Sequence, residues 1–391
     1  MNPSGIEKAH SFNDISNRAQ SRWNQSTESG VISQPDTGNS EAAAQRLDLI
    51  NAKGLGAGVT AFLLMPISLP ASEDAWVSRE KIMRCLVTGA AGFVGSPLVK
   101  RLHIDKTCEL VATTRSQASP FPPEVAHFPI EITDGTDWTA ALEGVDVIVH
   151  LAARVHIMND RAADPLAEFR RVNTAAALNL AEQAAHAGVQ RFVFISTIKV
   201  NGEQTDRPFR HDDRPNPIDP YGISKLECEI GLREIAARTG MEVVIIRPPL
   251  VYGPGARGNF ALLVNLVRRK LPLPFASLKN RRTLVAVQNL VDLIIACMDH
   301  PAAAGETFLA GDGEDLSTPD LIRGIAAGLG VKPMLVPFPP ALLHMAAKAL
   351  GKEAVYQRLC GSLQVDISRA RDVLGWSPVV TPREGLKQAV E

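Results

Sequence analysis

The sequence predicts an α/β fold in which a doubly wound parallel sheet is covered by helices on both faces. Short runs of consecutive apolar residues recur along the chain, as expected for strands that are buried on both faces. Segments with a helical pattern separate these runs, which is typical of a parallel sheet built from strand–helix–strand units. The 391 residues of the chain are enough for one large domain and a smaller one.

The predicted strands can be followed from Met83 onward. The first covers residues 83–88, and we expect a helix after it over residues 96–102. The later strands, all rich in Val, Ile, Leu or Phe, are expected at 110–114, 146–151, 191–196 and 242–247. Proline-rich connections follow, and the alternation weakens. We therefore predict a larger domain over residues 83–250 and a smaller mixed α/β domain over residues 251–391.

The first 80 residues differ from the rest in composition. Asn, Ser, Gln and Gly are frequent there and no sustained period is present, so we expect residues 1–80 to form a poorly ordered extension. Met83 directly precedes the first strand and is a candidate for the native start. No apolar run reaches the roughly 18 residues needed to span a bilayer, so we expect no stable membrane insertion.

Charge and cysteine content exclude several classes of partner. The 41 basic and 42 acidic residues give a formal net charge of −1, which argues against nucleic acid as the partner. The cysteines are odd in number and scattered, so we expect neither a disulfide framework nor a metal site, and a reducing cytoplasm fits them. They are Cys85, Cys108, Cys228, Cys297 and Cys360.

A glycine-rich turn joins the first strand to the first helix. Its sequence is Thr88-Gly89-Ala90-Ala91-Gly92-Phe93-Val94-Gly95. Glycines permit a tight turn and a close approach of the backbone to a pyrophosphate, which the unpaired N–H groups at the helix N-terminus attract. The spacing is GxxGxxG rather than GxGxxG, but the strand before it and the helix after it supply the context that the motif requires. The turn predicts a Rossmann-type dinucleotide site.

The end of the second strand bears on the choice of cofactor. An acid that binds the ribose 2′-hydroxyl usually stands there in NAD-selective proteins. Here the strand ends Thr113-Thr114-Arg115. Arg115 could pair with a 2′-phosphate and favour NADP, or it could be an ordinary exposed arginine at a strand end. Asp134 is placed to accept a hydrogen bond from an adenine amino group. The expected cofactor is therefore NAD or NADP.

Tyr221 and Lys225 are the predicted chemical centre. They are four residues apart and so share one face of a helix that Asp219 can cap and Pro220 can begin. A lysine ammonium beside a phenol favours the phenolate, so we expect a lowered pKa for Tyr221 and a role as acid and base at a hydroxyl group. Thr197, at the end of the 191–196 strand, could hydrogen-bond the same substrate oxygen.

Five motifs in this order resemble the extended short-chain dehydrogenases/reductases, and within them the NAD-dependent epimerase/dehydratase family of UDP-glucose 4-epimerase-like enzymes. They are Thr88–Gly95, His150-Leu151-Ala152-Ala153, Ser196-Thr197, Tyr221-Gly222-Ile223-Ser224-Lys225, and Arg247–Pro254. The resemblance covers residues 83 to about 385. It implies that the domain over residues 83–250 binds NAD(P) and that the domain over residues 251–391 binds a sugar nucleotide, normally a UDP-sugar, in a homodimer.

The resemblance also implies individual roles. Thr197, Tyr221 and Lys225 would be catalytic, and Thr197 and Tyr221 would also touch the substrate. The residues expected at the cofactor are Gly89, Gly92, Phe93, Val94, Gly95, Arg115, Asp134, Leu151, Ala152, Ala153, Asn173, Tyr221, Lys225 and Pro248. The remaining substrate contacts would be Asn259, Phe260, Arg282 for the diphosphate and, as a weaker candidate, Arg358.

The chain departs from the family pattern in ways that leave the reaction open. Thr197 replaces the usual serine, and Ala286 and Gln288 stand where relatives often have an aromatic residue or histidine and an acid. The segment Ser196–Glu203 resembles a bacterial surface-polysaccharide branch, some members of which reduce a UDP-4-keto-6-deoxy-N-acetylhexosamine. We therefore expect a UDP-hexose or UDP-N-acetylhexosamine 4-epimerase, with that 4-ketoreductase as the alternative. A non-catalytic nucleotide sensor is disfavoured because the Tyr–Lys pair is intact, and a dehydratase because no acid follows Thr197.

Overall fold

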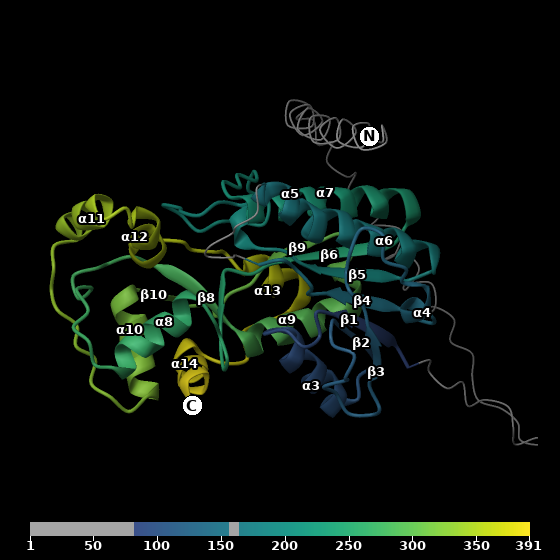
Figure 1. Cartoon of the computed structure of the whole chain (residues 1–391), viewed down its shortest axis with the longest axis horizontal. Helices are drawn as coiled ribbons and strands as arrows, with labels where there is room; N and C mark the ends of the chain where they lie inside the picture. Colours follow the sequence, from purple (N-terminus) through teal and green to yellow (C-terminus); the bar gives the residue numbers. More distant parts are fainter. Residues whose placement is uncertain (1–81, 156–163) are drawn as a thin grey trace, which may run out of the picture. The chain divides into compact units, whose positions relative to one another are not determined.

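A computed structural model describes residues 82–155 and 164–391, and the extension predicted for residues 1–80 lies outside this part. Its main feature is a seven-stranded sheet with the order β3-β2-β1-β4-β5-β6-β9, in which every adjacent pair of strands is parallel (Figure 1). This order and the helices on both faces confirm the predicted doubly wound, Rossmann-type sheet.

The observed strands agree closely with the sequence prediction. Each of the five apolar runs forms a strand within two residues of its expected ends. The two further strands, β3 and β9, were not predicted; both are short, and β3 ends at a proline. The strands are β1 (Arg84–Thr88), β2 (Glu109–Thr114), β3 (Ala126–Pro129), β4 (Val147–His150), β5 (Arg191–Ile195), β6 (Glu242–Arg247) and β9 (Thr307–Leu309).

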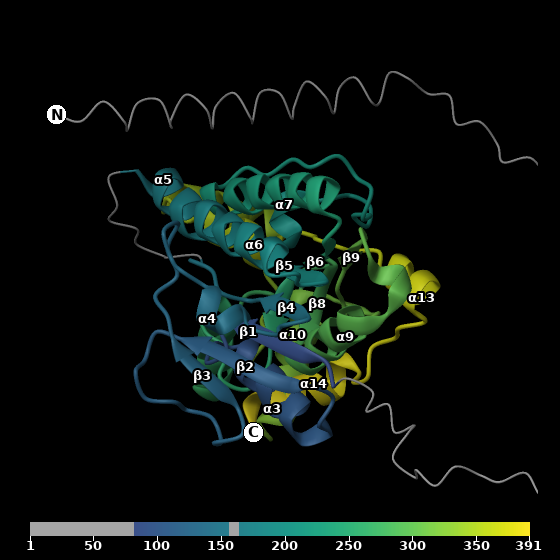
Figure 2. The same ribbon diagram turned by 90° about the vertical axis from the view of Figure 1, so that its right-hand side faces the viewer.

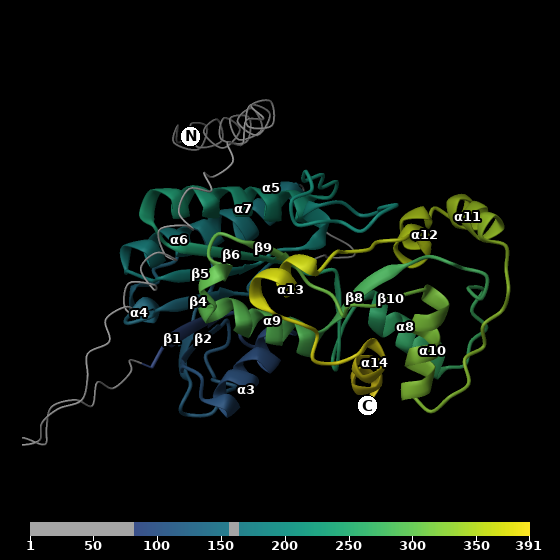
Figure 3. The same ribbon diagram turned by 180° about the vertical axis from the view of Figure 1, so that it is seen from behind.

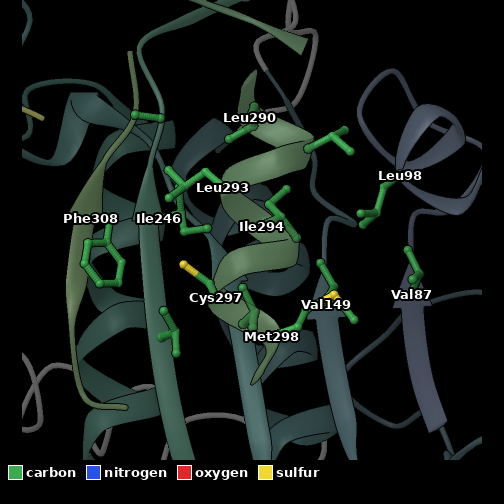
Figure 4. Packing of buried hydrophobic residues seen from close by; sticks show 14 of the residues in the cluster. Val87, Leu98, Val149, Ile246, Leu290, Leu293, Ile294, Cys297, Met298 and Phe308 are labelled. Carbon is green, nitrogen blue, oxygen red and sulfur yellow. The ribbon is translucent and has the colours of Figure 1, made fainter. Parts of the chain in front are cut away.

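The two faces of the sheet are covered by different helices (Figure 2). One face packs against α4 (Thr139–Leu142), α6 (Ala176–His186) and α7 (Pro220–Thr239), in a cluster that contains Trp138, Leu180 and Leu232. The other packs against α3 (Gly95–Asp105) and α9 (Val287–Asp299). Figure 4 shows the side chains of α9, among them Leu290, Leu293 and Ile294, lying against the strands.

A smaller mixed sheet lies beside the large one (Figure 3). Strand β8 (Arg282–Ala286) pairs in parallel with β7 (Leu250–Tyr252) and antiparallel with β10 (Asp315–Leu316). The division predicted at residue 250 stays a prediction, but α9 and β9 show that the chain returns to the large sheet after it. The helices of this region are α8 (Asn259–Arg268), α10 (Thr318–Gly328), α11 (Pro340–Ala349), α12 (Glu353–Cys360) and α14 (Pro382–Val390), while α13 (Ser368–Leu374) contacts β9.

Short helical segments complete the large half. They are α5 (Pro165–Phe169), the π-helical turn η1 (Arg170–Ala175), and the 3₁₀ turns η2 (Ile198–Val200) and η3 (Pro301–Ala303). Within residues 82–155 and 164–391, no helix has both the length and the apolar character to cross a membrane. The same residues contain no group of three or more His, Cys, Asp or Glu side chains placed to hold a metal ion.

Candidate active site

The glycine turn follows β1 at the point where the strand order reverses, between β1 and β4. Gly89 has φ +66°, and a Cβ added to it would lie 2.8 Å from the backbone nitrogen of Ala152. A Cβ on Gly95 would lie 2.3 Å from the carbonyl oxygen of Gly89. Only residues without a side chain allow this packing. In open α/β sheets the crevice at such a switch point is where ligands bind.

The start of α3 fits a pyrophosphate. Its N-cap, Val94, offers no side-chain hydrogen bond, and the first turn contains no acidic residue. The N–H groups and the helix dipole at this end therefore favour an anion. A Cβ on Gly92 would lie 2.9 Å from the Gly89 carbonyl oxygen, so the turn is compact at all three glycines. Phe93 and Val94 are partly buried against the core of the large sheet.

The end of β4 is held against this turn. Leu151 donates its backbone N–H to the Thr88 carbonyl at 3.3 Å, and Ala152 donates to the Thr88 hydroxyl at 3.4 Å. The same hydroxyl contacts Nδ1 of the buried His150 at 2.9 Å. Burial and the charge of Lys225 lower the pKa of His150 to about 3, so this imidazole is neutral at ordinary pH. The structure thus brings Leu151 and Ala152 beside the glycine turn, with Ala153 next in the chain.

Asn173 fastens α7, the helix of Tyr221 and Lys225, to the loop that follows β4. Its amide oxygen accepts from the backbone N–H of Arg154 at 2.8 Å, and its amide nitrogen donates to the Ser224 hydroxyl at 3.1 Å. Asn173 is buried and lies in the π-helical turn η1. Such turns are frequent at functional sites. These contacts hold α7 in place, and the part of Asn173 in cofactor binding stays a prediction.

Thr197 and Tyr221 approach each other from β5 and α7. Asp219 caps α7 by accepting from the backbone N–H of Gly222 at 2.7 Å, and Pro220 occupies the first helical position as expected. Tyr221 therefore lies in the first turn, where its ring packs against Phe169 with centroids 6.0 Å apart. The Thr197 hydroxyl lies close enough to the Tyr221 hydroxyl to lower its pKa. Two hydroxyl groups are thereby available to one substrate oxygen.

The sequence predicted that the Lys225 ammonium lies beside the Tyr221 phenol. In the structure it is bound to a backbone carbonyl instead. Its Nζ donates to the Ile195 carbonyl at 2.8 Å and lies 4.4 Å from the centre of the Phe194 ring. Burial lowers the pKa of Lys225 to about 8. The ammonium thus anchors α7 to the carboxyl end of β5.

The predicted lowering of the Tyr221 pKa is wrong for this structure. Burial raises the pKa of the phenol, the charge of Asp219 raises it further, and only the hydrogen bond with Thr197 lowers it. Lys225, whose ammonium donates to the Ile195 carbonyl, is not among the groups that shift this pKa. A phenolate at this position therefore needs a further positive charge close to the ring.

The end of β2 contains hydroxyl and basic groups and no carboxylate. Arg115 is exposed directly after the strand, and the Thr114 hydroxyl contacts Nε2 of His127 at 2.8 Å and donates to the Ser116 carbonyl at 3.2 Å. Asp134 is exposed in the turn that follows β3. The parts of Arg115 and Asp134 in cofactor binding stay predictions.

The predicted substrate residues lie in the smaller region and differ in their surroundings. Arg282 begins β8 and donates to the Gly361 carbonyl at 2.8 Å, which holds it beside the end of α12, the helix that contains Arg358. Asn259 begins α8 and is partly exposed. Phe260 is buried and packs on Tyr252 with ring centroids 5.6 Å apart, so its side chain belongs to the core of this region.

Pro248 is buried directly after β6, and its carbonyl accepts from the backbone N–H of Ile198 at 3.0 Å. This contact brings the end of β6 beside the residue that follows Thr197. The roles of Pro248 and of the four substrate residues stay predictions.

A buried ion pair behind the site was not predicted. Glu229, which follows Lys225 by one turn of α7, pairs with Arg247 at 2.5 Å and accepts from the Ser196 hydroxyl at 2.5 Å. Arg247 also donates to Asn201 at 3.0 Å. The spacing of Lys225 and Glu229 was visible in the sequence, but their partners lie far away in the chain.

A doubly wound sheet with a glycine turn at its switch point, and a Tyr–Lys pair on the helix beside it, defines a nicotinamide-dependent enzyme of the short-chain dehydrogenase type. The family model that matches residues 85–311 is that of the NAD dependent epimerase/dehydratase family, and the chain belongs to this family. The family is NAD dependent, which agrees with the predicted nicotinamide cofactor.

The relatives agree with this assignment. The chain is 46% identical over 314 residues to a UDP-glucose 4-epimerase of Vibrio cholerae, covering 78% of this chain and 94% of that protein. It is similar to the solved structure of the UDP-glucose 4-epimerase of Thermotoga maritima with UDP-glucose, with 25% identity, a TM-score of 0.63 and coverage of 79% and 97% of the two chains. It is also similar to MoeE5 in complex with UDP-glucose and NAD, with 26% identity, a TM-score of 0.62 and coverage of 78% and 97%.

Proposed function

We propose that this protein is a UDP-sugar 4-epimerase that interconverts a UDP-hexose or UDP-N-acetylhexosamine with its C4 epimer, in the synthesis of cell-surface polysaccharide. The observation that carries the proposal is the convergence of Thr197, Tyr221 and Lys225 at the edge of the sheet where the glycine turn lies. The relative that is 46% identical is named a UDP-glucose 4-epimerase, which supports the same reaction.

The residues suit acid–base chemistry at a C4 hydroxyl. NAD, when bound, supplies a reversible hydride acceptor with a positively charged nicotinamide ring. A positive charge beside Tyr221 opposes the effects of burial and of Asp219, and so favours the phenolate. The phenolate then takes the C4 hydroxyl proton as a hydride leaves C4, and a 4-keto sugar forms. The Thr197 hydroxyl donates to the same oxygen, and Lys225 keeps the helix in place through Ile195.

The second half of the reaction reverses the first. The 4-keto sugar rotates within the site so that its other face meets the cofactor, the hydride returns to that face of C4, and Tyr221 gives its proton back to the C4 oxygen.

Arg282, held beside α12, is suited to the diphosphate because a guanidinium can form two hydrogen bonds with such an anion. Arg358 and Asn259 complete the proposed substrate set, and we propose a homodimer as the working form.

The test is conversion of a panel of UDP-sugars, including 4-keto forms, by the purified protein without added cofactor. We expect epimer formation, and a loss of at least about 100-fold in kcat for Tyr221→Phe, since general acid–base catalysis contributes about 10² to 10⁴. Tyr356→Phe is the matched control, because this exposed phenol on α12 only donates to the Pro340 carbonyl at 3.3 Å. Full turnover by Tyr221→Phe would refute the assignment.

A 4-ketoreductase is the second candidate, and one observation favours it. The end of β2 presents Arg115 and the Thr114–His127 pair where NAD-selective proteins place an acid. An exchangeable NADPH would suit single reduction of a UDP-4-keto-6-deoxy-N-acetylhexosamine. Stoichiometric consumption of NADPH with such a sugar, and a raised KM for NADPH in Arg115→Ala, would favour the reductase over the epimerase.

A further inference from the structure

Lys199 connects the two segments that bear the reactive hydroxyl groups. Its Nζ contacts the carboxylates of Glu203, at 2.8 Å, and of Asp219. Its backbone N–H donates to the Thr197 hydroxyl at 3.3 Å. Asp219 is in turn fixed in place, because it caps α7 two residues before Tyr221.

The charges of this cluster act on the phenol. The negative charge of Asp219 opposes ionisation of Tyr221 and raises its pKa. The N-cap hydrogen bond fixes the Asp219 carboxylate at the start of α7, so the side chain cannot rotate away from Tyr221 to weaken this repulsion. Lys199 places a positive charge on the same carboxylate. Although burial lowers the pKa of Lys199, its hydrogen bonds to Asp219 and Glu203 raise it overall, so the ammonium stays charged at neutral pH.

We propose that Lys199 is a positioning residue that, through Asp219, sets how readily Tyr221 gives up and takes back its proton. The inference rests on the proposed function, since it assumes that Tyr221 is the acid–base group. It goes further by assigning a role to a residue outside the Thr197, Tyr221 and Lys225 set. With Lys199 present, the charge of Asp219 is balanced by the ammonium; without it, the Asp219 carboxylate acts on the phenol uncompensated.

The other charged groups around this end of α7 are already paired or directed elsewhere. Lys225 donates to the Ile195 carbonyl, and Arg154 lies 5.5 Å from the centre of the Phe169 ring on which Tyr221 packs. Further along the helix, ion pairs join α7 to the elements packed against it: Arg170–Glu227, Glu182–Arg238 and Arg247–Glu229. Among the described residues, Asp219 is the charged group that shifts the pKa of Tyr221, and Lys199 is paired with it.

A double-mutant cycle tests the inference through the pH profile of kcat/KM. Lys199→Met leaves Asp219 uncompensated, so the acidic limb should move to higher pH by about one unit. Asp219→Asn keeps a good N-cap and removes the charge, so the limb should move to lower pH. The double variant should return close to the wild-type limb, and Lys199→Arg should resemble the wild type. Lys387→Met, an exposed lysine on α14, is the control for the same chemical change and should leave the profile unchanged.

A role that is only structural would give another result. Both single variants would then lose activity by a similar factor at every pH, with no movement of the limb, and the inference would be overturned. Ionisation of Tyr221 can also be followed without turnover, by NMR of protein labelled with ¹³C-tyrosine and saturated with NAD, because the chain has only three tyrosines. Opposite shifts of the Tyr221 resonance in the two variants would support the role of Lys199 even if Tyr221→Phe turned over normally and the proposed function failed.

Discussion

Replacing Glu229 by Gln should destabilise the protein strongly, because this side chain is the centre of a fully buried network. Its carboxylate accepts from Arg247 at 2.9 and 2.5 Å and from the Ser196 hydroxyl at 2.5 Å, and no part of its side chain is exposed. Arg247 is 3% exposed and has Asn201 as a further acceptor. An amide in place of the carboxylate leaves this guanidinium buried without a counter-charge.

The expected loss is about 3 to 5 kcal/mol, the usual cost of breaking a buried ion pair by removing one partner. That is a large share of the roughly 5 to 15 kcal/mol that holds a typical domain folded. Urea unfolding of the full chain measures it, with far-UV circular dichroism and tryptophan fluorescence required to give coincident transitions. Arg323→Gln is the control, since the Arg323–Asp320 pair has good geometry at 2.7 Å but exposed side chains, and its removal should cost no more than about 1 kcal/mol.

The double variant Glu229→Gln, Arg247→Met shows whether the two side chains stabilise the fold as an interacting pair or independently of each other. Removing both charges avoids the buried uncompensated cation, and Arg233, which also contacts Glu229 at 3.7 Å, is 44% exposed to water, so much of the stability lost in Glu229→Gln should return. A loss of less than about 1 kcal/mol in Glu229→Gln would refute the reasoning. So would a double variant whose loss equals the sum of the two single losses.

Three further perturbations have expected outcomes. Tyr252→Phe removes the hydrogen bond of 2.7 Å to the buried Asp312, and should lower the free energy of unfolding by about 1 to 3 kcal/mol. Gly95→Ala places a Cβ 2.3 Å from the Gly89 carbonyl oxygen, so the turn must open and NAD affinity measured by calorimetry should fall at least 10-fold. The pKa of His150 is depressed to about 3 from its usual 6.5, so the unfolded chain binds more protons below pH 6.5, and this group should lower stability at pH 5 by about 2 kcal/mol relative to pH 7.

Each of these outcomes has a matched control. Tyr356→Phe removes an exposed phenol and should leave stability within about 0.5 kcal/mol of the wild type. Gly135→Ala adds a Cβ that meets nothing within 4 Å, so NAD affinity should be unchanged. His150→Asn should flatten the fall in stability between pH 7 and pH 5, whatever its effect at pH 7. An equally steep fall in that variant would show that another group is responsible.

The local parts of the structure could be predicted because their causes are local in the sequence. Apolar runs of five or six residues gave β1, β2, β5 and β6, and the cap at Asp219 gave the start of α7. Strand β9 has only three residues and is defined by its pairing with β6. A pattern of three residues is too short to predict such a strand. Long, buried strands could therefore be predicted from the sequence, and short ones could not.

The contacts that tune the site could not be predicted, because each joins residues that are distant in the chain. Lys225 and Ile195 are 30 positions apart, and Lys199 and Asp219 are 20 apart. The Tyr–Lys spacing therefore placed both residues on one helix, as observed, yet the expected direction of the Tyr221 pKa was wrong. Burial and a nearby carboxylate raise this pKa, and Lys225, whose ammonium donates to the Ile195 carbonyl, has no share in the shift.

The apolar pattern of α7 is interrupted in the half of the helix that contains Tyr221 and Lys225. An ordinary surface helix buries one apolar stripe. Here three of the five buried positions in the first half are polar, namely Ser224, Lys225 and Glu229 beside Gly222 and Cys228, and only Leu232 and Ile235 in the later turns are large and apolar. Each polar group has a partner on a different element: Asn173 in η1, the Ile195 carbonyl of β5 and Arg247 of β6. The first half of α7 is thus positioned by directional bonds instead of by apolar packing, which fixes Tyr221 more closely than hydrophobic contact would. A buried helix whose apolar period fails over two turns therefore indicates where its function lies.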